Sequence, residues 1–267
     1  MTINADLFVT NPIDYRIPND GVSKVSALTA GDEGQWEVLR YELTSFYCDG
    51  EYQAGLQRML DSYLANAARS TQPAAWVSGF YGSGKSHLVR VFEHLWKRTT
   101  FPDGADARGL TVLPDGISAA LRELDTVGER FGAPPWAVAG VLDAEKSDSV
   151  NLTFLAIVLR AAGLPEKVAP ARIALWLREA GLRSAVRAHV EAAGRDYFDE
   201  VRKYNLSTPL AEAILTAEPG FASSTGDVKA LLKNQYPAVS TLDTSETVTL
   251  LREVLLGIGH GQVPPTL

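Results

Sequence analysis

The stretch Trp76-Val77-Ser78-Gly79-Phe80-Tyr81-Gly82-Ser83-Gly84-Lys85-Ser86-His87 decides what fold this chain is expected to adopt. Residues 79–86 within it match G-x-x-x-x-G-K-[ST], the pattern of a phosphate-binding loop. An apolar run over residues 74–77 leads into the loop, and apolar side chains at helical spacing follow it at Leu88, Val89, Phe92, Leu95 and Trp96. The stretch therefore predicts a strand, a glycine loop and a helix, which is the context that the motif requires.

Such a loop works through its backbone. Its glycines permit positive φ angles and close approach of a ligand, so consecutive N–H groups can surround a phosphate. The helix that begins near Lys85 adds its own unpaired N–H groups. Lys85 is expected to reach the β- and γ-phosphates as the catalytic residue, and the Ser86 hydroxyl to bind Mg²⁺. We therefore predict a triphosphate site made of the loop residues Gly79, Phe80, Tyr81, Gly82, Ser83, Gly84, Lys85, Ser86 and His87.

The wider pattern predicts an α/β fold, a P-loop NTPase of AAA-like type with a three-layer core. Strands are expected at 74–77, 110–113 and 136–142, and helices at 33–48, 51–68, 115–131 and 151–162. The expected parts are an N-terminal arm with a helical pair (1–72), a P-loop nucleotide-binding core (73–164) and a helical subdomain (165–267). The alternative for the loop itself is a glycine-rich strand-to-helix turn with an accidental Lys-Ser pair.

Composition favours a cytoplasmic globular protein. The hydrophobic content is 46% and the charged content 21%, both ordinary for a globular chain, and no apolar run reaches the roughly 20 residues of a membrane span. Residues 1–7 lack the basic and apolar regions of a secretion signal. Cys48 is the single cysteine, which excludes a disulfide framework and a cysteine metal site, so a packing role is expected.

The net charge of −7 argues against direct binding of nucleic acid by the whole surface. Short basic clusters occur at residues 97–98 and 202–203. Such clusters are more often solvated helix faces than DNA contacts, so DNA is expected as an indirect partner at most.

The N-terminal arm, residues 6–28, combines short apolar runs with Pro12, Pro18 and Gly21. In many P-loop ATPases such an arm lies against the nucleotide base, so the apolar side chains of Ile13, Ile17 and Val22 are candidates for an adenine pocket. The alternative, which we favour, is an arm that packs over the edge of the core.

Three acidic residues follow the expected strand at 136–142, namely Asp143, Glu145 and Asp148. Carboxylates at that edge of an α/β sheet can hold Mg²⁺, but they are also ordinary capping residues, and we favour capping. Hydrolysis needs an acidic motif in addition to the glycine loop, and the chain offers no better candidate for it than these three residues. We therefore expect the chain to be a piece that ends before its Walker B strand, with hydrolysis belonging to a longer protein.

The arm at residues 7–14, the helical pair between Trp36 and Tyr63, and the loop at 76–87 together resemble the large BREX-system ATPases of the BrxC/PglY type. The resemblance is best over residues 6–97. It implies an AAA-like ATPase that uses ATP and Mg²⁺ and acts with a methyltransferase and a phosphatase-like partner to mark host DNA and block phage. It leaves open assembly as a homo-oligomer. The phosphate-loop roles fall on Gly79, Gly82, Gly84, Lys85 and Ser86.

Three functions are weighed on these grounds. The first is an ATP-binding, ATP-hydrolysing module of a phage-defence complex. The second is a nucleotide-sensing regulatory or scaffolding protein that binds ATP without turnover. The missing acidic strand separates the two functions, because hydrolysis needs it. The third, a small-molecule or nucleotide kinase, fits the long arm and helical tail poorly.

Overall fold

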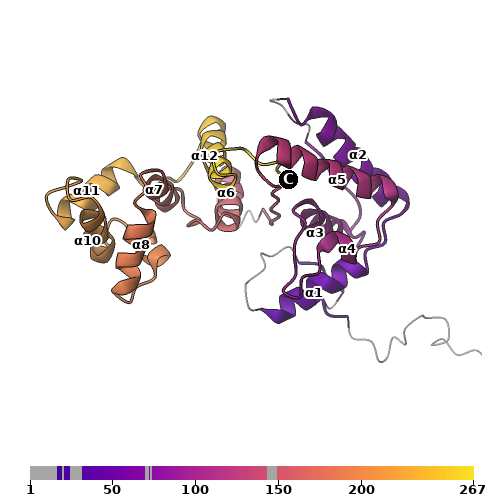
Figure 1. Cartoon of the computed structure of the whole chain (residues 1–267), viewed down its shortest axis with the longest axis horizontal. Helices are drawn as coiled ribbons and strands as arrows, with labels where there is room; N and C mark the ends of the chain where they lie inside the picture. The colour runs from indigo at the N-terminus through magenta and orange to yellow at the C-terminus, as the bar shows by residue number, and fades with distance from the viewer. Residues whose placement is uncertain (1–16, 20, 25–31, 70–71, 73, 143–148) are drawn as a thin grey trace, which may run out of the picture. The chain divides into compact units, whose positions relative to one another are not determined.

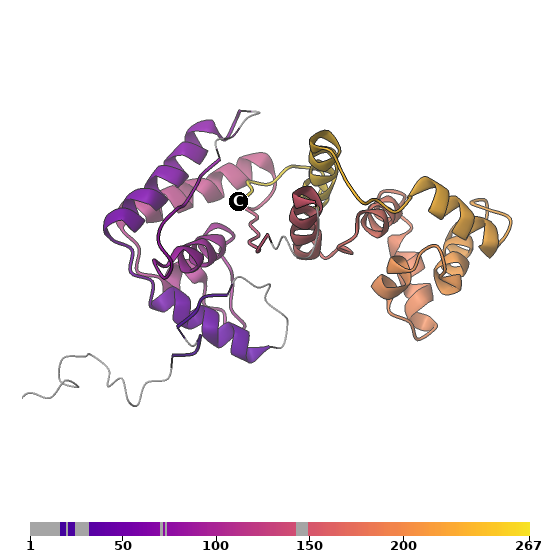
Figure 2. The same cartoon turned by 180° about the vertical axis from the view of Figure 1, so that it is seen from behind.

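The computed structural model describes residues 17–19, 21–24, 32–69, 72, 74–142 and 149–267. The chain divides into two compact units, one of residues 1–139 with 265–267 and one of residues 140–264. Figures 1 and 2 show both units from opposite sides. Each is built from helices, and each is described by itself below.

The first unit contains five helices within the described residues, namely α1 (Glu33–Thr44), α2 (Gly50–Asn66), α3 (Lys85–Trp96), α4 (Ala107–Leu110) and α5 (Asp115–Phe131). Aspartates start several of them: Asp32, Asp49 and Asp106 accept a backbone N–H at the helix start. α2 and α5 lie side by side (Figures 1 and 2). The core forms where their apolar faces meet those of α1 and α3.

Helix α3, which follows the glycine loop, is the most buried element of this unit. Apolar side chains on several of its faces are almost inaccessible, including Leu88, Val91, Phe92, Leu95 and Trp96. Trp96 also donates a hydrogen bond from Nε1 to the carbonyl of Pro265 at 3.2 Å. Burial on so many sides fixes the direction of α3 and therefore the place of the loop before it.

The predicted α/β three-layer core of an AAA-like P-loop NTPase is wrong for this structure, because the described residues form helices and no sheet. Residues 74–80 belong to no strand, and Trp76 is 91% exposed. At 136–138 the chain makes only an isolated parallel bridge to residues 265–267, with Trp136 N–H donating to Pro265 O at 2.8 Å. Residues 111–113 are likewise outside any strand, and Leu110 ends α4.

The physical reason lies in the pairing that strands need. A short apolar run satisfies its backbone groups as a strand only beside another strand. The described part of the chain brings no such neighbour to residues 74–77. Apolar continuity alone therefore predicted strands that the structure does not contain.

The second unit is helical, as the sequence predicted for most of it. Its helices within the described residues are α6 (Val150–Ala161), α7 (Val168–Glu179), α8 (Arg183–Ala192), α9 (Tyr197–Arg202), α10 (Thr208–Ala217), α11 (Thr225–Gln235) and α12 (Thr244–Ile258). α6 packs against α12, and α10 packs against both α8 and α11 (Figure 1). A hydrophobic core centred on α7, α8 and α10 holds α8, α10 and α11 together.

Among the described residues, no helix combines the length and apolar character needed to cross a bilayer.

Candidate functional site

The glycine loop leads directly into α3. Gly82 and Gly84 have φ angles of 78° and 80°, the left-handed region in which glycine is favoured. Gly84 is the N-cap residue of α3 and gives it no side-chain cap. The first N–H groups of a helix lack partners within the helix, so the turn that begins at Lys85 presents donors toward the loop.

Lys85 folds back over the loop that precedes it. Its Nζ donates to the carbonyl oxygens of Gly79 at 2.8 Å and Phe80 at 2.7 Å, and lies 3.3 Å from the Ser83 hydroxyl. The loop is thereby closed around one ammonium group, with the positive charge held at the start of α3. This arrangement places a cation and helix N–H groups together, the chemistry that binds a phosphate.

The other predicted loop residues divide into two groups. Phe80 and Tyr81 direct fully exposed side chains to solvent, and Phe80 contributes to the loop through its carbonyl. Ser86 is exposed on the first turn of α3, where its hydroxyl is free to meet a ligand from solvent. His87 instead turns inward, with Nε2 2.7 Å from the carbonyl oxygen of Glu42 and its ring edge-on to Phe46.

Two residues that the sequence did not single out support the loop. The Tyr52 hydroxyl, on α2, donates to the carbonyl of Ser83. Glu42, on α1, holds His87 as described above. Tyr52 lies within the predicted helix at 51–68, and no local pattern marks Tyr52 or Glu42, because both contacts join residues more than thirty positions apart.

Magnesium would depend chiefly on Ser86 and on the phosphates themselves. No group of three or more His, Cys, Asp and Glu side chains lies together in the part of the chain that the structure describes. The acidic candidates Asp143, Glu145 and Asp148 lie outside the described residues. A single exposed hydroxyl at a helix start fits an ion that keeps most of its ligands from water and substrate phosphates.

A pocket of about 550 Å³ lies along α1, next to α3. Its lining comes from the start of α1, from Arg90 of α3, and from the described part of the N-terminal arm. From here on, "the arm" means these described residues, 17–19 and 21–24. The lining residues are Pro18, Asn19, Val22, Lys24, Asp32, Gly34, Gln35, Glu37, Val38 and Arg90. Of the apolar arm residues proposed for an adenine pocket, Val22 lines this space, Ile17 does not, and Ile13 lies outside the described residues.

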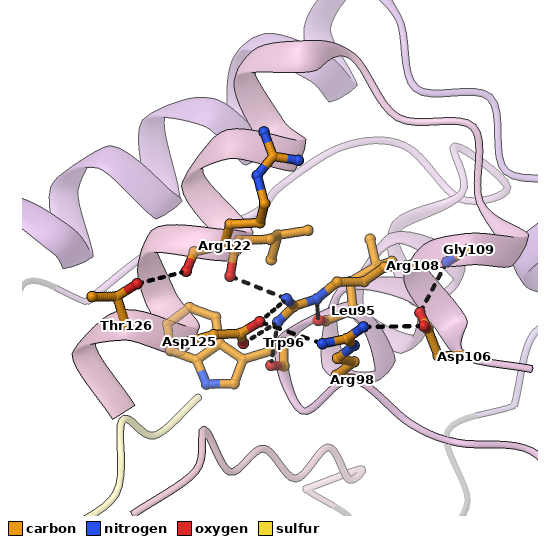
Figure 3. Close-up of polar contacts among 10 residues, drawn as sticks. Leu95, Trp96, Arg98, Asp106, Arg108, Gly109, Arg122, Asp125 and Thr126 are labelled. Atoms are coloured by element: carbon orange, nitrogen blue, oxygen red, sulfur yellow. Dashed lines mark hydrogen bonds and ion pairs between the residues drawn. The ribbon is translucent and has the colours of Figure 1, made fainter. Parts of the chain in front are cut away.

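The far end of α3 is held by an arginine (Figure 3). Arg108 donates to the carbonyl oxygens of Leu95 at 2.7 Å and Trp96 at 3.2 Å, which are among those left unpaired at a helix end. The same guanidinium binds both carboxylate oxygens of Asp125 on α5, at 2.7 and 2.9 Å. α3 is therefore fixed to α5 at its C-terminal end and to α1 at its N-terminal end.

Asp106 in the same cluster caps α4 by accepting the Gly109 N–H at 3.0 Å. Burial by itself would raise the pKa of Asp106, but the Gly109 N–H and the nearby Arg98 guanidinium outweigh it and lower the pKa. The group is therefore a stable anion and a structural one.

His94 is buried within α3, and its Nδ1 lies 2.8 Å from the Thr99 hydroxyl. Burial, with Lys97 and Arg90 nearby, lowers the pKa of His94 to about 2, so the ring is neutral.

Comparison of the chain with protein-family models, curated proteins and solved structures finds no significant match.

Proposed function

We propose that this chain binds a nucleoside triphosphate, taken to be ATP with Mg²⁺, on the loop of residues 79–86 and the first turn of α3. The observation that carries the proposal is the Lys85 ammonium group, held over the loop by the carbonyls of Gly79 and Phe80. An ammonium has three donors and no acceptor, so phosphate oxygens can replace the loop carbonyls as its partners. Gly82 and Gly84 already have the backbone conformation that turns N–H groups toward such a ligand.

The resemblance of residues 6–97 to BREX-type ATPases supports a wider proposal. In it, the chain is the ATP-binding and ATP-hydrolysing module of a cytoplasmic anti-phage complex. Its partners would be a methyltransferase and a phosphatase-like subunit, and it would reach DNA through them. The net charge of −7 favours this indirect contact over direct binding to the phosphate backbone.

A second candidate is a nucleotide-sensing or scaffolding role without turnover. Its supporting observation is that the described residues bring no acidic cluster to the loop, whereas turnover needs a group that orients the attacking water. The two candidates differ in one measurement. Phosphate release from Mg·ATP that Lys85→Ala abolishes supports the ATPase, and binding without release supports the sensor.

Binding is tested first, by calorimetric titration of Mg·ATP and Mg·GTP into wild type and Lys85→Ala. We expect Lys85→Ala to weaken ATP binding at least about tenfold, because it removes a charge-assisted contact to phosphate. Lys233→Ala serves as the control, since it removes an equal charge from an exposed position on α11. Equal affinities in all three proteins would contradict the triphosphate site.

A further inference from the structure

One buried carboxylate joins three separate parts of the first unit. Glu42, near the end of α1, has no exposed surface. Its carboxylate accepts hydrogen bonds from two arm residues, Asn19 Nδ2 at 3.2 Å and Ser23 Oγ at 2.5 Å. It also forms an ion pair with Nε of Arg90 on α3 at 2.5 Å, and Arg90 is 2% exposed.

Arg90 continues this connection to the backbone of the arm. Its second nitrogen donates to the carbonyl oxygen of Lys24 at 2.8 Å. Three hydrogen bonds thus join the arm to the Glu42–Arg90 pair. Two of these arm residues, Asn19 and Lys24, line the 550 Å³ pocket together with Arg90. The pair therefore holds a wall of the pocket in place.

The pair also reaches the phosphate loop. The carbonyl oxygen of Glu42 lies 2.7 Å from Nε2 of His87, in the first turn of α3. Arg90 follows Lys85 by five residues on the same helix, roughly 7.5 Å along its axis. One rigid helix therefore carries both the lysine that closes the loop and the arginine that holds the arm.

On the basis of the triphosphate site proposed above, we propose that Glu42 and Arg90 are positioning residues that hold the arm beside the phosphate loop, so that arm and loop engage one ligand together. A buried ion pair is stable only while both partners are present, because removing one leaves an uncompensated charge. Loss of the Glu42 charge breaks the ion pair with Arg90 and so weakens the three hydrogen bonds that join the pair to the arm. The loop itself, closed by Lys85, does not depend on that charge.

The first test is limited trypsin digestion, followed by mass spectrometry. Lys24 is an exposed arm residue, and its carbonyl, which trypsin would attack, is the one that Arg90 holds. We expect cleavage after Lys24 to be at least about tenfold faster in Glu42→Gln, since cleavage follows local opening. Glu93→Gln is the control, because it removes a carboxylate of α3 that pairs with Lys97 at 2.6 Å. An unchanged rate in Glu42→Gln overturns the proposal.

A second variant separates release of the arm from loss of the fold. Asn19→Ala combined with Ser23→Ala removes the two arm side chains that donate to Glu42 and leaves the Glu42–Arg90 pair intact. We expect faster cleavage after Lys24 with an unchanged far-ultraviolet circular dichroism spectrum. Slow cleavage in this double variant, or equally faster cleavage after Arg122 on α5, overturns the positioning role.

The third measurement compares two ligands, Mg·ATP and magnesium tripolyphosphate. Tripolyphosphate occupies only the loop, whereas ATP also extends beyond it. In Glu42→Gln we expect ATP to bind at least about tenfold more weakly and tripolyphosphate to stay within about twofold of wild type. An equal loss for both ligands overturns the proposal. If wild type binds neither ligand, the triphosphate site is wrong, while digestion after Lys24 still decides whether the pair holds the arm.

Discussion

Arg108 binds both carboxylate oxygens of Asp125, at 2.7 and 2.9 Å, and it also donates to the last two carbonyls of α3 and to the Leu121 carbonyl of α5. Arg108 is mostly buried, with 12% of its side chain exposed. A planar guanidinium with five donors is suited to this combination of a bidentate ion pair and a helix end. The contact links the helix of the phosphate loop to α5 without touching the loop.

The first prediction follows from this contact. Arg108→Ala is expected to lower the free energy of unfolding by about 2–4 kcal/mol, because it removes the bidentate partner of Asp125 and the donor to two carbonyls at the end of α3. Urea denaturation followed by circular dichroism measures the change. Arg122→Ala is the matched control, since it removes an exposed arginine from α5, and its cost should stay within about 0.5 kcal/mol. Equal costs would contradict the structural role of Arg108.

The second prediction concerns acid. The pKa of His94 is about 2 in the folded chain, below its ordinary value of 6.5. Between these values the unfolded state binds a proton that the folded state does not, so stability is full above pH 6.5 and falls as pH decreases. By pH 5 the loss from His94 alone should be about 2 kcal/mol.

His94→Asn removes the titrating ring and keeps a polar atom near the Thr99 hydroxyl. We expect the decrease of unfolding free energy between pH 7 and pH 5 to be smaller in this variant by about 2 kcal/mol. His189→Asn, on α8, is the control and should keep the wild-type dependence. Parallel pH profiles for wild type and His94→Asn would show that the ring is protonated in the folded protein.

The third prediction separates two glycines of the loop. Both have positive φ, so alanine at either position should cost about 1 kcal/mol through backbone strain. At Gly84 a Cβ would also approach the Tyr52 hydroxyl to 2.6 Å, whereas at Gly82 it would meet nothing within 4 Å. Gly84→Ala should therefore destabilise the protein more than Gly82→Ala in urea denaturation. A larger cost at Gly82 would contradict the loop geometry.

Sequence patterns predicted the helices well where spacing and caps agree. Helix α5 has the predicted bounds of 115 and 131 and ends at Gly132, whose φ is 72°. The strands failed, because an apolar run such as 74–77 shows what can be buried but not whether a neighbouring strand exists. Trp76 lies in this run, and its side chain is 91% exposed because no sheet covers it.

The site could be predicted only in part for a related reason. The motif identifies Lys85 and the glycines, since their spacing is local. The contacts of Tyr52 and Glu42 with this region join α2 and α1 to residues far along the chain, and they depend on how the helices pack. Glu42 resembles any polar residue of an amphipathic helix until its burial is known.

The last prediction tests one of these unforeseen contacts. Tyr52→Phe keeps the ring and its edge-on contact with Phe46 but removes the hydroxyl that donates to the Ser83 carbonyl. The hydrogen bond is exposed, so its loss should change the unfolding free energy by less than about 1 kcal/mol. The loop loses its link to α2, however, and more of its conformational freedom must then be lost when the ligand binds.

We therefore expect Mg·ATP to bind Tyr52→Phe about three- to tenfold more weakly than wild type, as measured by calorimetric titration. Tyr47→Phe is the matched control, since its hydroxyl donates to the exposed Asp49 carboxylate at 3.3 Å and not to the loop. Weakened binding in both variants would indicate a general effect of losing a tyrosine hydroxyl. Weakened binding in Tyr52→Phe alone, with stability retained, would show that α2 holds the loop ready for its ligand.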